Sequence, residues 1–148
     1  MSAYCTMAEA DDYFLTKRIN SEDWFTNSEE RKDAALETAT RYIDLLNLVG
    51  DKHLEDQELE FPRDDDEDVP EPIKMATYEI AFALITGRDI EMESEMDGDS
   101  SHSVDMARAN FSGFINEARV HGIPSIVAWK LLRPFTRDGS TFTLSRTD

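Results

Sequence analysis

Cysteine is almost absent from this chain of 148 residues, in which Cys5 is the only one. A single cysteine cannot form a disulfide within the chain, which is typical of proteins that fold in a reducing compartment. Histidine is also scarce, and His53, His102 and His121 do not fall at the spacings that hold zinc. The sequence therefore predicts no disulfide framework, no zinc site and no cofactor.

Long apolar runs and glycine-rich turns are missing as well. No apolar stretch approaches the roughly 18 residues that span a bilayer, and the N-terminus has no basic segment followed by an apolar one. Gly98 and Gly113 are isolated, so there is no phosphate-binding loop, and no serine triad can be assembled. We expect a protein that is made in the cytoplasm, has no membrane partner and is not an enzyme.

Acidic residues are what the chain has in excess. There are 32 Asp and Glu against 15 Lys and Arg, which gives a formal net charge of −17. Residues 51–71 and 88–105 together carry −15 of that charge. Because like charges repel and keep a segment extended, we expect two solvated acidic loops, over residues 51–70 and 88–105. Such a chain should repel nucleic acid at long range.

Both acidic stretches suggest calcium binding, which the spacing argues against. The Asp64–Asp68 run places carboxylates at the first three ligand positions of an EF-hand loop. Val69, however, stands where that loop needs glycine, and Met75 stands where it needs glutamate. The run that begins at Asp97 fails at the same two positions. Hydrated acidic loops are the interpretation we favour.

Helical signals dominate the N-terminal half. Thr6 and Glu9 match a capping box that would open a first helix. Cap signals at Thr26 and the next residue precede a longer helix, which the apolar periodicity extends to Val49. Gly50 then occupies the position of a C-terminal cap.

Two further helices are expected in the C-terminal half. Residues 72–87 are apolar nearly all the way round, which predicts a helix buried by its own domain or by a neighbouring subunit. A last helix opens at Pro124 and is stopped by Pro134. Its buried face is expected to carry Val127 and Leu131, with Ile126 and Trp129 beside them.

The remaining segments have weaker signals. Residues 106–121 fit a weak helix or a strand-like segment. Residues 140–145 alternate and are rich in β-branched side chains, which predicts a short strand that needs a partner edge, in this chain or another. The expected fold is therefore mainly α: a small bundle of about four helices over residues 1–137, with long acidic loops, followed by an extended arm or short strand at 138–148.

Trp24 and Trp129 have two interpretations, packing in a core or stacking on nucleic-acid bases. Stacking platforms normally lie in basic grooves. Only residues 106–148 have surplus positive charge, from six basic residues against three acidic ones. Both tryptophans also stand among helical apolar positions, so core packing is the interpretation we favour. The basic residues have a competing use, which is to pair with the acidic loops of a neighbouring copy.

Two short segments are the most informative feature of the chain. The first is Gln57-x-Leu-x-Phe61-Pro62-Arg63, and the second is Gly122-Ile123-Pro124-Ser125-x-x-Ala128-Trp129-x-Leu131-Leu132-x-Pro134-Phe135. In this order, on a small acidic chain, they resemble the head-to-tail connector (adaptor) proteins of tailed bacteriophages. The opening stretch, Tyr4–Phe14, resembles the start of the same family. We interpret most of the matching residues as architectural.

The resemblance implies a structural part of a virion. Connectors of this kind are small helical proteins that form a typically dodecameric ring beneath the portal. The ring surrounds the channel through which DNA leaves the capsid and joins the portal to the tail or nozzle. The implied partners are copies of itself, the portal, the tail protein, and DNA that passes without sequence-specific contact. Some relatives are described as DnaT-like single-stranded-DNA-binding proteins, a description that a net charge of −17 fits poorly.

The resemblance also suggests places for two segments. Residues 138–148 are expected to reach the portal, with Phe142 and Leu144 docking and the 140–145 backbone adding to a portal strand. Thr141, Thr143 and Arg146 complete that partner-binding set. A second set is expected to face the channel, where a ring of negative charge would repel the DNA phosphates and let the DNA slide. This set is Glu91, Glu93, Glu95, Asp97 and Asp99.

Two other functions stay open at this point. A small acidic protein can bind a host protein as a DNA mimic, but that function predicts a folded acidic face, whereas the acids here lie mostly in expected loops. Single-stranded-DNA binding would show as a salt-dependent affinity for oligonucleotides. The neck subunit is the function that the sequence favours.

Overall fold

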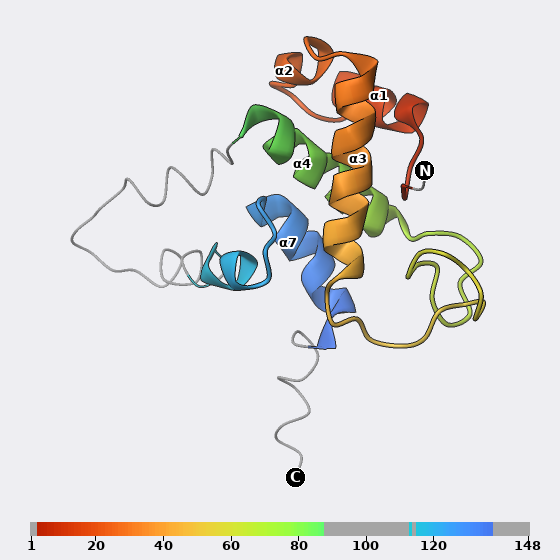
Figure 1. Cartoon of the computed structure of the whole chain (residues 1–148). Helices are drawn as coiled ribbons and strands as arrows, with labels where there is room; N and C mark the ends of the chain where they lie inside the picture. The colour runs from red at the N-terminus through yellow and green to blue at the C-terminus, as the bar shows by residue number, and fades with distance from the viewer. Residues whose placement is uncertain (1–2, 88–112, 114, 138–148) are drawn as a thin grey trace, which may run out of the picture.

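The protein is mainly helical and compatible with a small bundle, as the sequence predicts. The structure is a computed structural model that describes residues 3–87, 113 and 115–137. Its two longest helices among those residues are α3 (Glu29–Asp44) and α4 (Glu71–Thr86), which pack together (Figure 1). α4 also packs against α7 (Ile126–Leu132). None of the helices in the described residues has the length and apolar character needed to cross a bilayer.

α4 is the central helix of the bundle. Its buried residues come from every side of the helix, as the all-round apolar pattern of residues 72–87 predicts. Ile73, Ala76, Ile80 and Ala81 are all 0% exposed. The helix ends at Thr86 with Gly87 as its cap, close to the expected boundary.

The N-terminal helices pack along one side of α4. α1 (Met7–Thr16) begins with the predicted capping box, in which Thr6 and Glu9 satisfy each other's backbone N–H groups. α2 (Glu22–Phe25) follows and buries Trp24, whose ring stacks on Phe14 with the centroids 4.4 Å apart. Trp24 is 0% exposed, which confirms core packing for this residue.

The predicted bounds of α3 are wrong at both ends. Ser28, not Thr26 or Asn27, is the N-cap, because its Oγ accepts the Arg31 N–H at 3.2 Å. The helix stops at Asp44 rather than Val49. Beyond it, the backbone pairs with the far end of the described chain.

That pairing explains the early end of α3. Leu48 forms an antiparallel bridge with Thr136. The Val49 N–H donates to the Phe135 carbonyl at 2.9 Å, and the Arg137 N–H donates to the Asn47 carbonyl at 2.8 Å. These long-range hydrogen bonds require an extended backbone, so residues 47–49 leave the helix although their side chains fit its periodicity.

α7 is rotated relative to the prediction. Ser125 caps it, and the helix gives way at Pro134 to the 3-10 turn η1 (Arg133–Phe135). Val127 and Leu131, which were expected to be buried, are only half-buried. Ile126 and Trp129, which were expected beside them, are buried together with Ala128 and Leu132, because the facing helical segment 115–120 covers the Trp129 side. The ambiguity of residues 106–121 is resolved as helix for residues 115–120.

Cys5 should react slowly in the folded protein. Its thiol is half-buried, and burial, aided by the negative charge of Glu9, raises its pKa to about 12. Only the thiolate reacts, so at neutral pH we expect thiol labelling of the native protein to be at least about tenfold slower than labelling in denaturant. A time course with a chromogenic disulfide reagent, with and without urea, measures this ratio. Equal rates would contradict the buried thiol.

Candidate interaction surfaces

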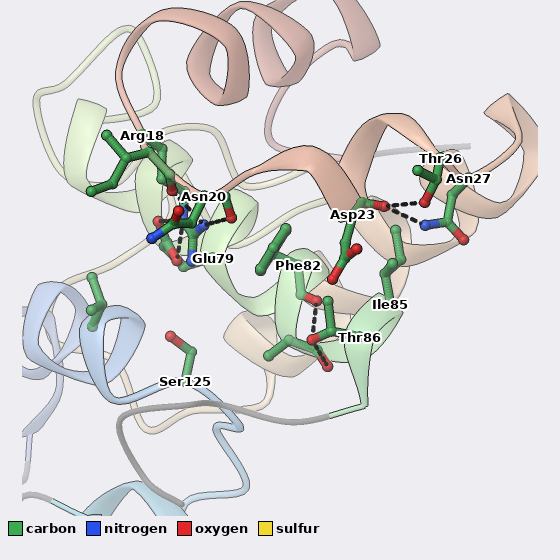
Figure 2. Close-up of a pocket in the computed structure, with 13 residues that line it drawn as sticks. Arg18, Asn20, Asp23, Thr26, Asn27, Glu79, Phe82, Ile85, Thr86 and Ser125 are labelled. Atoms are coloured by element: carbon green, nitrogen blue, oxygen red, sulfur yellow. Dashed lines mark hydrogen bonds and ion pairs between the residues drawn. The ribbon is translucent and has the colours of Figure 1, made fainter. Parts of the chain in front are cut away.

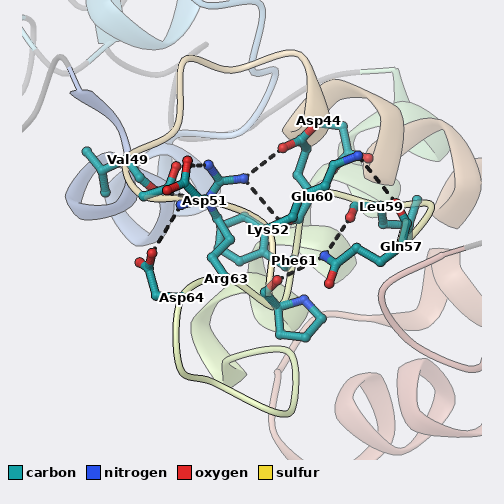
Figure 3. A network of polar contacts seen from close by, with 12 residues as sticks. Asp44, Val49, Asp51, Lys52, Gln57, Leu59, Glu60, Phe61, Arg63 and Asp64 are labelled. Atoms are coloured by element: carbon teal, nitrogen blue, oxygen red, sulfur yellow. Dashed lines mark hydrogen bonds and ion pairs between the residues drawn. The ribbon is translucent and has the colours of Figure 1, made fainter. Parts of the chain in front are cut away.

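The segment 57–63 folds into a loop that is held by its own side chains (Figure 3). Gln57 closes it from the inside: its Nε2 donates to the carbonyls of Leu59 at 2.8 Å and Pro62 at 2.9 Å, and its Oε1 accepts the Leu54 N–H at 2.9 Å. The His53 N–H donates to the same Pro62 carbonyl at 3.0 Å. A single amide side chain therefore organises the turn.

Arg63 joins this loop to the chain that leaves α3. It is 9% exposed, and its Nε donates to the Val49 carbonyl at 2.8 Å. Nη2 donates to the carbonyl of Gly50, and Nη1 donates to the Glu60 carbonyl and to its carboxylate, the latter at 2.7 Å. Three backbone carbonyls thus depend on one planar guanidinium, whose fixed fork of donors suits this task.

Gly50 is needed at a close approach and not as a helix cap. Its φ is +81°, a conformation that side-chain-bearing residues rarely adopt. A Cβ at this position would collide with the Asp64 carboxylate, which accepts the Asp51 N–H at 3.1 Å. The predicted role of Gly50 is therefore corrected: it lets two acidic ends of the 51–64 loop come together.

The three segments that carry the resemblance meet at Phe61. Phe61 is 4% exposed and makes edge contacts with Tyr4, at 5.8 Å between ring centroids, and with Phe135, at 5.7 Å. Its N–H donates to the Tyr4 hydroxyl at 3.2 Å, and that hydroxyl donates to the Asp44 carboxylate. Burial raises the pKa of both the Tyr4 hydroxyl and the Asp44 carboxyl. The opening stretch, the turn and the closing helix are thus one packing unit.

A second polar cluster positions the closing helix. Trp129 is 0% exposed, which favours packing over stacking on nucleic-acid bases, and its Nε1 donates to Glu117 Oε1 at 2.9 Å. The same oxygen accepts from Arg133 Nε at 2.8 Å. The His121 ring stacks on the indole at 4.7 Å between centroids. Gly122, with φ +76°, then turns the chain toward buried Ile123.

A groove of about 840 Å³ opens between the α1–α2 connection, α4 and the start of α7 (Figure 2). At its floor, Arg18 Nε donates to both oxygens of Glu79, at 3.0 and 3.2 Å, and its guanidinium lies 4.1 Å from the centre of the Phe82 ring. The Tyr13 hydroxyl donates to Glu79 at 2.5 Å. Burial and this contact with the carboxylate raise the pKa of Tyr13. Ile19, Ile85 and Val127 supply apolar walls.

The groove cluster was not predicted from the sequence. Its signal is Glu79, an acid placed in the middle of an apolar helix, which needs a partner when it is buried. The partners, Tyr13 and Arg18, lie more than sixty positions away and have no spacing that reveals them. The described residues contain no group of histidine, cysteine and acidic side chains that could hold a metal ion.

Many of the predicted interaction residues lie outside the described part of the chain. This applies to the portal-binding set Thr141, Phe142, Thr143, Leu144 and Arg146, with the strand predicted at 140–145. It applies equally to the channel-facing set in the 88–105 segment. Of the acidic loop 51–70, the Asp64–Asp68 run is exposed, as predicted for a solvated connection.

Of the comparisons with known proteins, one gives a match. A family model described as "Putative DnaT-like ssDNA binding protein" matches residues 1–147. No curated protein and no solved structure gives a match.

Proposed function

The chain belongs to this DnaT-like family, and from that premise we propose that it serves as a structural subunit of a tailed-phage neck. In this role it forms a ring that joins the portal to the tail and surrounds the DNA exit channel. Residues 138–148 contact the portal, and the acids of the 88–105 segment face the passing DNA. The protein carries out no reaction.

The meeting of three segments at Phe61 is the observation that carries the proposal. The connector-like residues of the opening stretch, the turn and the closing helix pack against each other and form hydrogen bonds with each other. Arg63 is 9% exposed and Gln57 is half-buried, and both use their side-chain donors to hold backbone carbonyls. Residues that hold the fold together in this way are expected in a structural protein whose partners bind to its other surfaces.

Single-stranded-DNA binding is the second candidate, since the family description names it. Two features of the protein argue against DNA binding, the burial of its tryptophans and its net charge. Both tryptophans are 0% exposed, so neither offers a face on which a base could stack. The net charge of −17 would repel phosphates unless a strongly segregated basic face opposed it.

Quantitative mass spectrometry of purified virions tests the proposal. We expect about one copy of this protein per portal subunit, as a closed ring that matches the portal requires. Fluorescence anisotropy with a labelled oligonucleotide at low and high salt tests the second candidate in parallel. Absence of the protein from virions, together with salt-dependent oligonucleotide binding, would replace the neck function with the DNA-binding one.

A further inference from the structure

Among the described residues that line the groove, one charged side chain has no ion pair. Arg18 and Glu79 neutralise each other at its floor. Asp23, on the rim, is exposed and has no ion pair among the described residues. It belongs to α2. Beside it, Ile19 is 82% exposed, so the rim combines a negative charge with an apolar side chain.

A complementary pair lies elsewhere on the same chain. Arg119 is exposed and has no ion pair within the described part of the molecule, and the adjacent Val120 is 81% exposed. They end the helical segment 115–120, which Figure 1 shows well separated from α2. This distance prevents the two surfaces from meeting within one folded chain.

We propose that the groove receives the Arg119–Val120 helix end of a second copy of this chain. Val120 then packs against Ile19 and the apolar wall of the groove, and Arg119 pairs with Asp23. The first contact buries exposed apolar surface, and the second pairs two charges that have no ion pair among the described residues. The second copy is the occupant because its charge and its apolar side chain match those of the rim.

The geometry of such a contact deepens the proposed function, on which this inference rests. The two surfaces are different, so a pair of copies joined by one contact still has one free groove and one free helix end, to which further copies can add. A contact of this head-to-tail kind builds a ring when the rotation between copies closes. The inference thus names the subunit interface of the proposed neck ring.

Disulfide trapping between two variants tests the contact. Asp23→Cys and Arg119→Cys are made in the full chain, mixed in equal amounts and oxidised gently, both free and bound to the portal protein. A cross-link in the mixture joins one copy's groove to the other's helix end, whereas each variant alone presents only half of the pair. We expect the mixture to give at least about fivefold more covalent dimer than either variant alone. Cys5, with its raised pKa, stays a slow background.

Leu45→Cys is the matched control, because Leu45 is also strongly exposed, at 83%. Mixed with Arg119→Cys, it should give no more dimer than single variants. If the Asp23→Cys mixture matches this control both free and on the portal, the contact is overturned. Portal binding separates the two claims: a wild-type chain that binds the portal while the mixture fails to cross-link overturns the interface alone, and a chain that does not bind it overturns the proposed function.

Discussion

Arg63→Ala should lower the free energy of unfolding by about 3 kcal/mol, because three half-buried carbonyls lose the donor that they share. The substitution leaves the carbonyls of Val49, Gly50 and Glu60 without the guanidinium that now reaches all three. For a domain of this size, the midpoint of thermal unfolding should fall by about 9 °C. Calorimetry or circular dichroism on the purified variant measures the shift.

Two further variants isolate the cause. Arg63→Lys keeps the positive charge but presents a single nitrogen, so it should lose most of the same stability. Arg31→Ala removes a charge of the same sign from an exposed position on α3 and should shift stability by no more than about 0.5 kcal/mol. If Arg63→Ala and Arg31→Ala have the same midpoint of thermal unfolding, the loop does not depend on the guanidinium.

Deletion of residues 138–148 should abolish portal binding while the remaining domain stays folded. The last described residues are anchored upstream of the cut: Thr136 is 0% exposed and pairs with Leu48, and the Arg137 N–H donates to the Asn47 carbonyl. We therefore expect the thermal midpoint to change by less than about 4 °C. Pull-down with purified portal protein measures the binding.

A double substitution tests whether portal binding needs the apolar side chains of residues 138–148 or only the length of that segment. Phe142→Ser with Leu144→Ser keeps the chain intact but removes the two apolar side chains expected to dock. Ser140→Ala with Ser145→Ala, in the same segment but outside the partner-binding set, is the control and should bind as the unchanged chain does. Undiminished binding by the truncated protein would place the portal contact elsewhere and leave residues 138–148 without the proposed role.

Elements with strong local signals were predictable from the sequence. The Thr6–Glu9 capping box depends on two side chains three positions apart, so it can be read directly and is present. The all-round apolar pattern of residues 72–87 predicts burial on every side, and α4 is the centre of the bundle. Both follow from short-range physics that needs no knowledge of the fold.

Features that depend on distant partners could not be predicted. The apolar periodicity extends α3 to Val49, yet the backbone of residues 47–49 pairs with residues 135–137 instead. The buried face of α7 is set by Glu117, which draws Trp129 and Arg133 toward the preceding helix. In the groove, Glu79 signals that it needs a partner, but only the fold shows that Arg18 and Tyr13 provide it.

The pairing of Asn47 and Val49 with residues 135–137 has a consequence for synthesis. These backbone groups join positions almost ninety residues apart, and contacts of such long sequence separation form late in folding. On the ribosome, α1, α2 and α3 can emerge and collapse early, but residues 47–49 cannot pair with residues 135–137 until Arg137 has left the exit tunnel. A nascent chain arrested before that point would expose the Phe61 face and be a target for chaperones and proteases.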